Sequence, residues 1–171
     1  MRIIASGVFC IVSFILQSTL FSQFNIGGIV PNLLLIVTAT IGFIIGRKYG
    51  MVTGFVAGLL TDIFFGSVIG FYALMYMYIG YLNGTFKKIL YPGDFKLPLL
   101  LIVGSDVIYS HAVYFFMFFI QGQFHYAFYL KKVILPEVVY TTVIACILYP
   151  IMKFFFNKID KWEQKVTGES V

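Results

Sequence analysis

Six long apolar segments are the feature that most constrains how this chain can fold. A helix needs about 20 mostly apolar residues to cross the hydrocarbon core of a bilayer, with roughly 17 to 25 as the working range. Segments of this kind run over residues 3–21, 29–46, 49–65, 69–86, 97–120 and 133–156. They predict an all-α integral membrane protein in which residues 1–156 form a six-helix bundle, followed by a basic cytoplasmic tail at 157–171.

The overall composition favours the same class. Apolar residues make up 60% of the chain and charged residues only 11%, whereas about a quarter of a soluble domain is charged. The net charge is +5, but the basic residues lie in short clusters between apolar segments. Such clusters are typical of the loops that orient a membrane protein. A nucleic-acid-binding protein instead gathers its basic residues on one face. We therefore expect a lipid bilayer around the chain and no nucleic acid as a partner.

The basic clusters also predict the orientation. Cytoplasmic loops of membrane proteins collect Lys and Arg. If the N-terminus is cytoplasmic, only Lys131 and Lys132 lie outside, which leaves ten of the 12 basic residues on the inner side. The opposite orientation would reverse that ratio. Six crossings then place both termini in the cytoplasm.

Three glycines in the third segment, Gly50, Gly54 and Gly58, follow one another at four-residue spacing. On a helix they lie on one face and form a groove without side chains. Such a groove lets two helices approach closely in a membrane. A binding groove is the alternative, and packing within the bundle is the interpretation we favour.

Asp62 extends this glycine face by one step. A carboxylate within a spanning helix is costly and usually faces the bundle or an aqueous cavity. It could satisfy free backbone N–H groups at the start of the fourth helix, or it could have a functional role. The sequence leaves both open.

Four polar residues of the last two segments are further candidates for a functional role: Asp106, Ser110, His111 and Glu137. Asp106 follows the start of its helix by about 15 Å, near the midplane, and Ser110 shares its face. His111 is about 140° further round the helix, so a proton relay with Asp106 is not favoured. Glu137 follows Pro136 at a helix start, where the helix dipole stabilises a carboxylate.

The first segment carries a weakly polar stripe, formed by Ser6, Cys10, Ser13 and Gln17. Polar and small side chains of this kind form contacts between membrane helices. Packing within the chain is the default explanation. As a candidate partner interface we choose Ser6, Ser13 and Gln17, because a terminal helix is easily left on the outside of a bundle.

No catalytic motif is present in the sequence. It contains no nucleophile elbow, no phosphate-binding loop, and no His/Cys cluster with metal-ligand spacing. We therefore expect neither an enzyme nor a cofactor.

The segment GLLTDIFFGSVIGFYAL, residues 58–74, resembles the rod shape-determining MreD family. The hallmark G-L-L-x-D-x-x-x-G-x-x-x-G is matched by Gly58, Leu59, Leu60, Asp62, Gly66 and Gly70. The family's Pro-Asp/Asn-Leu-Leu opening of the second helix resembles the segment beginning at Pro31 and Asn32.

The resemblance implies a non-enzymatic scaffold of the bacterial cell-elongation complex, in the cytoplasmic membrane. Such a protein binds the single-pass protein MreC, and with it links MreB filaments to the peptidoglycan polymerase and transpeptidase. The family is also similar to the S components of energy-coupling-factor vitamin transporters. A substrate-binding subunit of that type is the alternative function, and an ion-coupled carrier using Asp106 is a third.

The orientation can be tested with a reporter that is active only outside the membrane. Fused after His125 the reporter should be active, and fused after Lys88 or at the C-terminus it should be silent. External activity of the Lys88 fusion would contradict the assignment of the basic loops to the cytoplasm.

Overall fold

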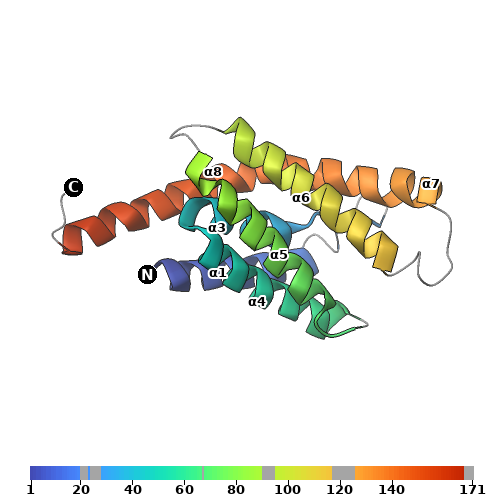
Figure 1. Ribbon diagram of the computed structural model, residues 1–171, viewed down its shortest axis with the longest axis horizontal. Coiled ribbons are helices and arrows are strands. Elements are labelled where there is room, and N and C mark those ends of the chain that lie inside the picture. Colours follow the sequence, from blue (N-terminus) through green and yellow to red (C-terminus); the bar gives the residue numbers. More distant parts are fainter. Residues whose placement is uncertain (20–22, 24–27, 67, 90–94, 117–125, 168–171) are drawn as a thin grey trace.

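The computed structural model describes residues 1–19, 23, 28–66, 68–89, 95–116 and 126–167. The long helices within these ranges are α1 (Arg2–Ser18), α3 (Leu33–Ile45), α4 (Arg47–Phe65), α5 (Phe71–Thr85), α6 (Lys96–Tyr114) and α8 (Leu135–Thr167). Three short elements complete them: the 3-10 helix η1 (Phe86–Ile89), α7 (Tyr126–Tyr129) and the π-helical turn η3 (Leu130–Ile134). The fold is all-α (Figure 1).

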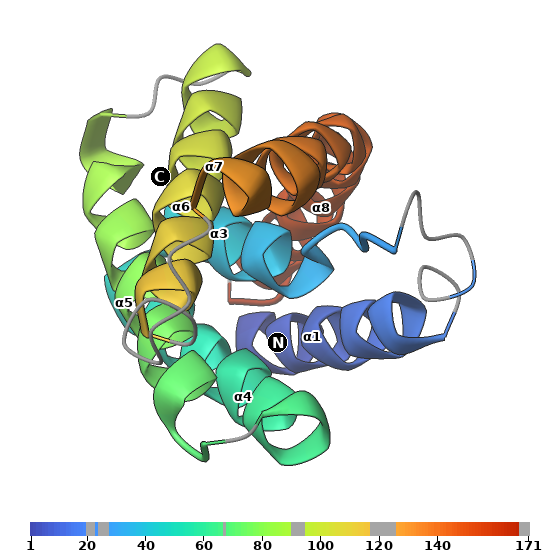
Figure 2. The same cartoon turned by 90° about the vertical axis from the view of Figure 1, so that its right-hand side faces the viewer.

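Helix α3 is the centre of the molecule. It packs against α1, α4, α5, α6 and α8, which surround it (Figure 2). Its residues from Leu33 to Phe43 are all buried. A helix that is apolar on every side is stable only when neighbours cover it completely. With 13 residues, α3 is about 20 Å long, shorter than the roughly 30 Å hydrocarbon core.

Helices α4 and α5 form the closest helix pair. A methyl group added at Gly54 would overlap the backbone of Tyr76, and one added at Gly58 would overlap the backbone of Tyr72 and Ala73. From the other side, Gly80 lies against the backbone of Gly50. The glycine face of α4 is thus filled by α5 of the same chain.

Helix α3 joins this contact through Gly42. A methyl group there would lie 2.7 Å from the carbonyl oxygen of Gly80. The turn from α3 into α4 is a single residue, Gly46, with φ of +127°. Only glycine adopts that conformation readily, so α4 folds back directly beside α3.

Helix α8 extends past the bundle. The residues expected to form a basic tail continue α8 as far as Thr167, and residues 168–171 lie outside the described part. This extension meets the N-terminus, because Arg2 Nε lies 2.8 Å from Asp160 Oδ1 and the Met1 amino group 3.3 Å from Glu163 Oε1. The N-terminus and the last turns of α8 therefore lie at the same end of the molecule (Figure 1).

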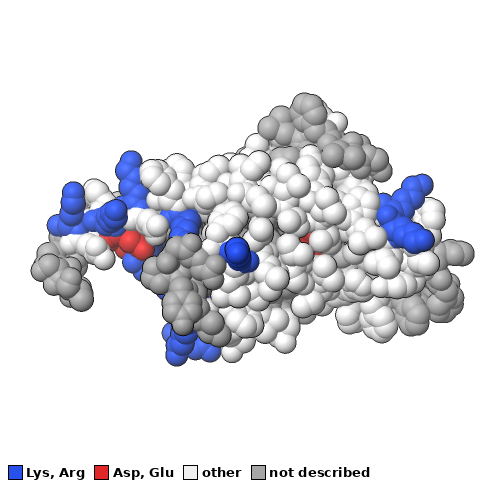
Figure 3. Space-filling view, turned by 90° about the horizontal axis from the view of Figure 1, so that it is seen from above, with Lys and Arg blue, Asp and Glu red and all other residues white. Residues whose placement is uncertain are grey.

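Two helical stretches are long and apolar enough to cross a membrane on length and composition: Lys96–Tyr114 and Tyr126–Lys165. The shorter apolar helices are Arg2–Ser18 and Leu33–Ile45. Most Lys and Arg lie toward the two ends of the molecule, and the surface between them shows few charged residues (Figure 3). Several helices begin or end inside the expected segments; α3 in particular starts at Leu33 and not at Ile29.

The α4–α5 contact makes a stability prediction. Gly54→Leu and Gly58→Leu should each lower the free energy of unfolding, because a side chain must force two backbones apart. Overpacking of this kind typically costs about 1–3 kcal/mol. The measurement is the yield and thermal unfolding of the purified protein in detergent.

Gly104→Leu is the matched control, since nothing lies within 4 Å of a methyl group added there. It should be as stable as the parent. Equal stability of the Gly54 variant and this control would contradict the close contact.

Candidate functional site

Asp62, the carboxylate of the family motif, caps helix α5. Its two oxygens accept backbone N–H bonds from Gly70 at 2.9 Å, Tyr72 at 2.9 Å and Ala73 at 3.0 Å. The side chain is only 1% exposed. The first N–H groups of a helix have no partner within it, and the helix dipole attracts a negative charge there. Asp62 satisfies both requirements from the preceding helix.

The other motif residues shape the same hairpin. Gly70, at the N-cap of α5, has φ of +102°, a conformation that favours glycine. Its N–H donates to Asp62 Oδ2. A methyl group at Gly66 would lie 2.7 Å from the carbonyl oxygen of Asp62. Gly58 gives α5 its close approach. Leu59 and Leu60 are half-buried on α4.

Asn32 joins three helices. Its side-chain oxygen accepts the N–H of Leu35 at 3.2 Å, which caps α3, and the hydroxyl of Tyr76 from α5 at 2.7 Å. Its own N–H donates to Thr141 Oγ1 of α8 at 3.1 Å. Pro31, buried beside it, precedes the helix. The Pro-Asn pair thus ties the start of α3 to α5 and α8.

Gln17 serves the same helix start, and this corrects the expected partner interface. Its Oε1 accepts the N–H of Leu34 at 3.2 Å. Ser6 and Ser13 are 4% and 2% exposed, and Ser6 donates to the carbonyl of Arg2 at 2.9 Å. The stripe therefore faces the interior: Ser6 and Ser13 are buried, and Gln17 binds the start of α3. It is not the exposed surface of α1.

The other end of α3 is held by Lys87. Its ammonium donates to the carbonyl oxygen of Ile45 at 2.8 Å. Partial desolvation, and then the charge of Arg2, lower the pKa of Lys87, while Asp160 raises it. In the sequence, Lys87 is one of the ten basic residues assigned to the inner side, and no local pattern indicates this role.

Asp106 and Ser110 form a second buried group on α6. Asp106 is fully buried and Ser110 is 3% exposed. Neither the carboxylate oxygens nor the Ser110 hydroxyl have a hydrogen-bond partner within the described part of the chain. Two residues of α8 lie near this group, Thr141 beside Asp106 and Glu137 beside Ser110.

His111 lies apart from that group. Its Nδ1 is 2.8 Å from the carbonyl oxygen of Val107, and its Nε2 is 2.9 Å from the hydroxyl of Tyr126. It belongs to an aromatic group with Tyr114 and Tyr126 near the start of α7. The structure therefore separates His111 from Asp106.

Asn83 is a polar contact that sequence reasoning did not single out. Its amide donates to Ser105 Oγ at 2.7 Å and to the carbonyl oxygen of Ile79 at 2.8 Å, and so links α5 to α6. An asparagine beside Gly84 in an apolar segment was the available signal. No group of three or more His, Cys, Asp or Glu that could hold a metal ion occurs among the described residues.

These features define a class: an all-α membrane protein whose interior polar groups mainly join and cap its own helices. The chain belongs to the MreD family, since the model for the rod shape-determining protein MreD matches residues 1–159. It is thus a membrane protein with a role in determining rod shape, in a family of shape-determining proteins and not of enzymes. No curated protein and no solved structure matches it.

The Asp62 cap can be tested by substitution. Asp62→Leu leaves one buried and two half-buried N–H groups without this partner. It should lower the free energy of unfolding by about 2–4 kcal/mol, since each lost hydrogen bond costs about 1 kcal/mol or more. Asp62→Asn keeps one acceptor oxygen and should cost less. Thermal unfolding of both variants is the measurement.

Asp160→Asn is the control, because it alters an ion pair near the surface, and such pairs contribute about 0–1 kcal/mol. If Asp62→Leu is no more destabilising than Asp160→Asn, the cap account is wrong.

Proposed function

We propose that this protein is a non-enzymatic scaffold of the cell-elongation complex in the bacterial cytoplasmic membrane. It binds an MreC-like single-pass protein, and with it links MreB filaments to the peptidoglycan polymerase and transpeptidase. The observation that carries the proposal is the family match over 159 of the 171 residues. Maintenance of cell shape and lateral peptidoglycan synthesis follow from that assembly.

The proposed topology is a six-helix membrane bundle with cytoplasmic termini. Its support is that the N-terminus and the C-terminal part of α8 meet through ion pairs at one end of the molecule. The basic residues expected inside include Arg2 and Lys161, which belong to that end. An even number of crossings and a basic inner side both agree with this arrangement.

The outer face of α1 is the surface we propose for the partner. Helix α1 packs mainly on α3 and α4, and its opposite side exposes a row formed by Ile4, Val8, Ile11 and Ile15. The row repeats every three or four residues, so it lies on one face of the helix. Helices associate in lipid by close packing and not by a hydrophobic driving force, and branched side chains in one row suit such packing.

The substrate-binding alternative receives no support from the comparisons with known proteins. The ion-carrier alternative would depend on Asp106. A scaffold does not require the protonation of Asp106 to change, whereas an ion carrier requires its carboxyl group to bind and release a proton. Asp106→Asn therefore distinguishes the two functions.

The experiment expresses tagged variants in cells that lack their own copy. Val8→Trp with Ile15→Trp should reduce recovery of the MreC-like partner about tenfold and give rounded cells. Val143→Trp with Ile147→Trp, on the exposed side of α8, is the matched control and should retain both partner and rod shape. Asp106→Asn should also support rod-shaped growth.

Failure to recover any single-pass partner with the parent protein would overturn the scaffold proposal. Equal recovery with both tryptophan pairs would remove the α1 face while leaving the scaffold in place. Loss of rod shape with Asp106→Asn, at normal protein level, would favour the carrier.

A further inference from the structure

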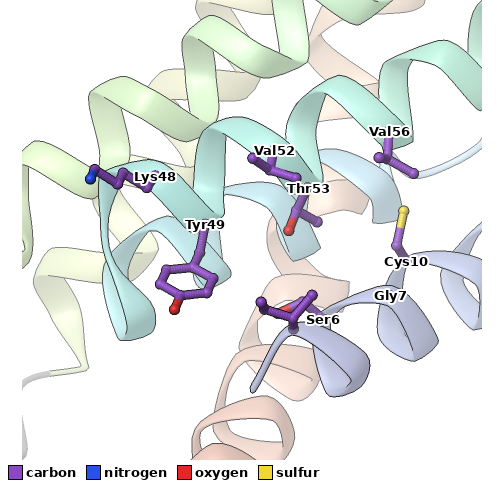
Figure 4. Close-up of a pocket in the computed structure, with 9 residues that line it drawn as sticks. Ser6, Gly7, Cys10, Lys48, Tyr49, Val52, Thr53 and Val56 are labelled. Carbon is purple, nitrogen blue, oxygen red and sulfur yellow. The ribbon is translucent and has the colours of Figure 1, made fainter. Parts of the chain in front are cut away.

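A lateral groove lies between α1 and α4, which contact each other elsewhere. Figure 4 shows it lined by Gly7 and Cys10 of α1 and by Val52 and Val56 of α4, with Lys48 at one end. Its volume is about 340 Å³, and most of its lining is apolar. It opens sideways, where the proposed topology places the bilayer.

No side chain in the described part of the chain fills the space between these parts of α1 and α4. On the α5 side of α4, backbone occupies the space above Gly54 and Gly58. On the α1 side, nothing lies within 4 Å of a methyl group added at Gly7. Val52 and Val56 are 57% and 45% exposed there. Small side chains on both helices thus leave a hollow that the protein's own packing does not close.

The end of the groove carries positive charge. Lys48 lines it and is exposed, and in the described part of the chain it has no ion pair. Lys48 and Tyr49 also line an adjoining hollow of about 390 Å³ together with Arg47. Two cations beside a tyrosine at the end of an apolar groove match a headgroup of negative charge, since aromatic rings favour headgroup level.

The charge at its end favours a lipid over a partner helix. The lining is mostly apolar, with Lys48 at one end. An acyl chain suits the apolar part and a phosphate suits the lysine. An apolar partner helix would leave the lysine without a negative partner.

We propose that this groove binds one anionic phospholipid of the cytoplasmic leaflet. One acyl chain lies between Gly7 and Val52, and the phosphate lies against Lys48 and Arg47. The cytoplasmic leaflet supplies anionic lipids, which basic residues at its surface attract. The proposal rests on the proposed topology and goes beyond the scaffold function, because it makes a lipid part of the α1–α4 contact.

The test places the purified protein in nanodiscs of phosphatidylglycerol and phosphatidylcholine in equal amounts and counts retained lipids by native mass spectrometry. The parent should retain one phosphatidylglycerol. Gly7→Leu, which fills the groove from α1, should lower retention of that lipid about tenfold. Val52→Trp fills the groove from α4 and should do the same. Gly104→Leu, equally unobstructed on α6, should leave retention unchanged.

A second pair of variants tests the charge. Lys48→Gln should reduce the preference for phosphatidylglycerol about fivefold, as expected for one basic residue at a membrane surface. Lys88→Gln, an exposed cation outside the groove, should not change it. Thermal unfolding of every variant checks that the bundle remains folded.

Unchanged retention in folded Gly7→Leu or Val52→Trp would overturn the site. Equal retention of the two lipids by the parent would overturn the anionic assignment. Loss of the MreC-like partner in Gly7→Leu with retained lipid would show that the groove seats a helix. Failure to find any protein partner would overturn the scaffold function and leave the lipid result standing.

Discussion

Backbone polar groups at helix ends have no water to bind inside a bilayer, and this constraint organises the whole molecule. Each helix end leaves several N–H or carbonyl groups without a partner within the helix, and an unpaired polar group in an apolar medium costs several kcal/mol. Helix α3 is too short to carry both ends to the membrane surfaces. Asn32 and Gln17 bind its first N–H groups, and Lys87 binds its last carbonyl.

The same constraint explains the α4–α5 hairpin. The turn between the helices is short, so α5 begins beside the last turn of α4, and its first N–H groups have no partner within α5. Asp62 satisfies three N–H groups there, and the glycines of α4 bring the two backbones close enough for this. The family motif therefore combines a cap with a packing surface. Most polar side chains that cap or join helices point inward. The exterior is therefore largely apolar, which suits contact with partner helices and lipid.

The sequence predicted some of these features from local pattern. The apolar segments predicted an all-α membrane protein, and the four-residue spacing predicted that Gly54 and Gly58 share one face of a helix. The Asp62 cap was one of two interpretations, because a helix start eight residues away can be read from the chain.

Other features depend on contacts between distant segments. The partner of Gln17 is the N–H of Leu34, which no spacing rule identifies. The default explanation of the polar stripe, packing within the chain, agrees with the structure, and the candidate partner interface drawn from it was wrong. Periodicity defines a face but not what covers it. The role of Lys87 and the continuation of α8 to Thr167 were missed for the same reason: both depend on neighbours that only the fold brings together.

The central claim is that side chains from other parts of the chain hold the buried helix ends. Amide hydrogen exchange in detergent, resolved by NMR, tests it directly in the unaltered protein. The account predicts that the N–H groups of Leu34, Leu35, Tyr72 and Ala73 exchange as slowly as those in the middle of α3. Rapid exchange at these four positions, with the middle of α3 protected, would show that the caps do not form and would contradict the account.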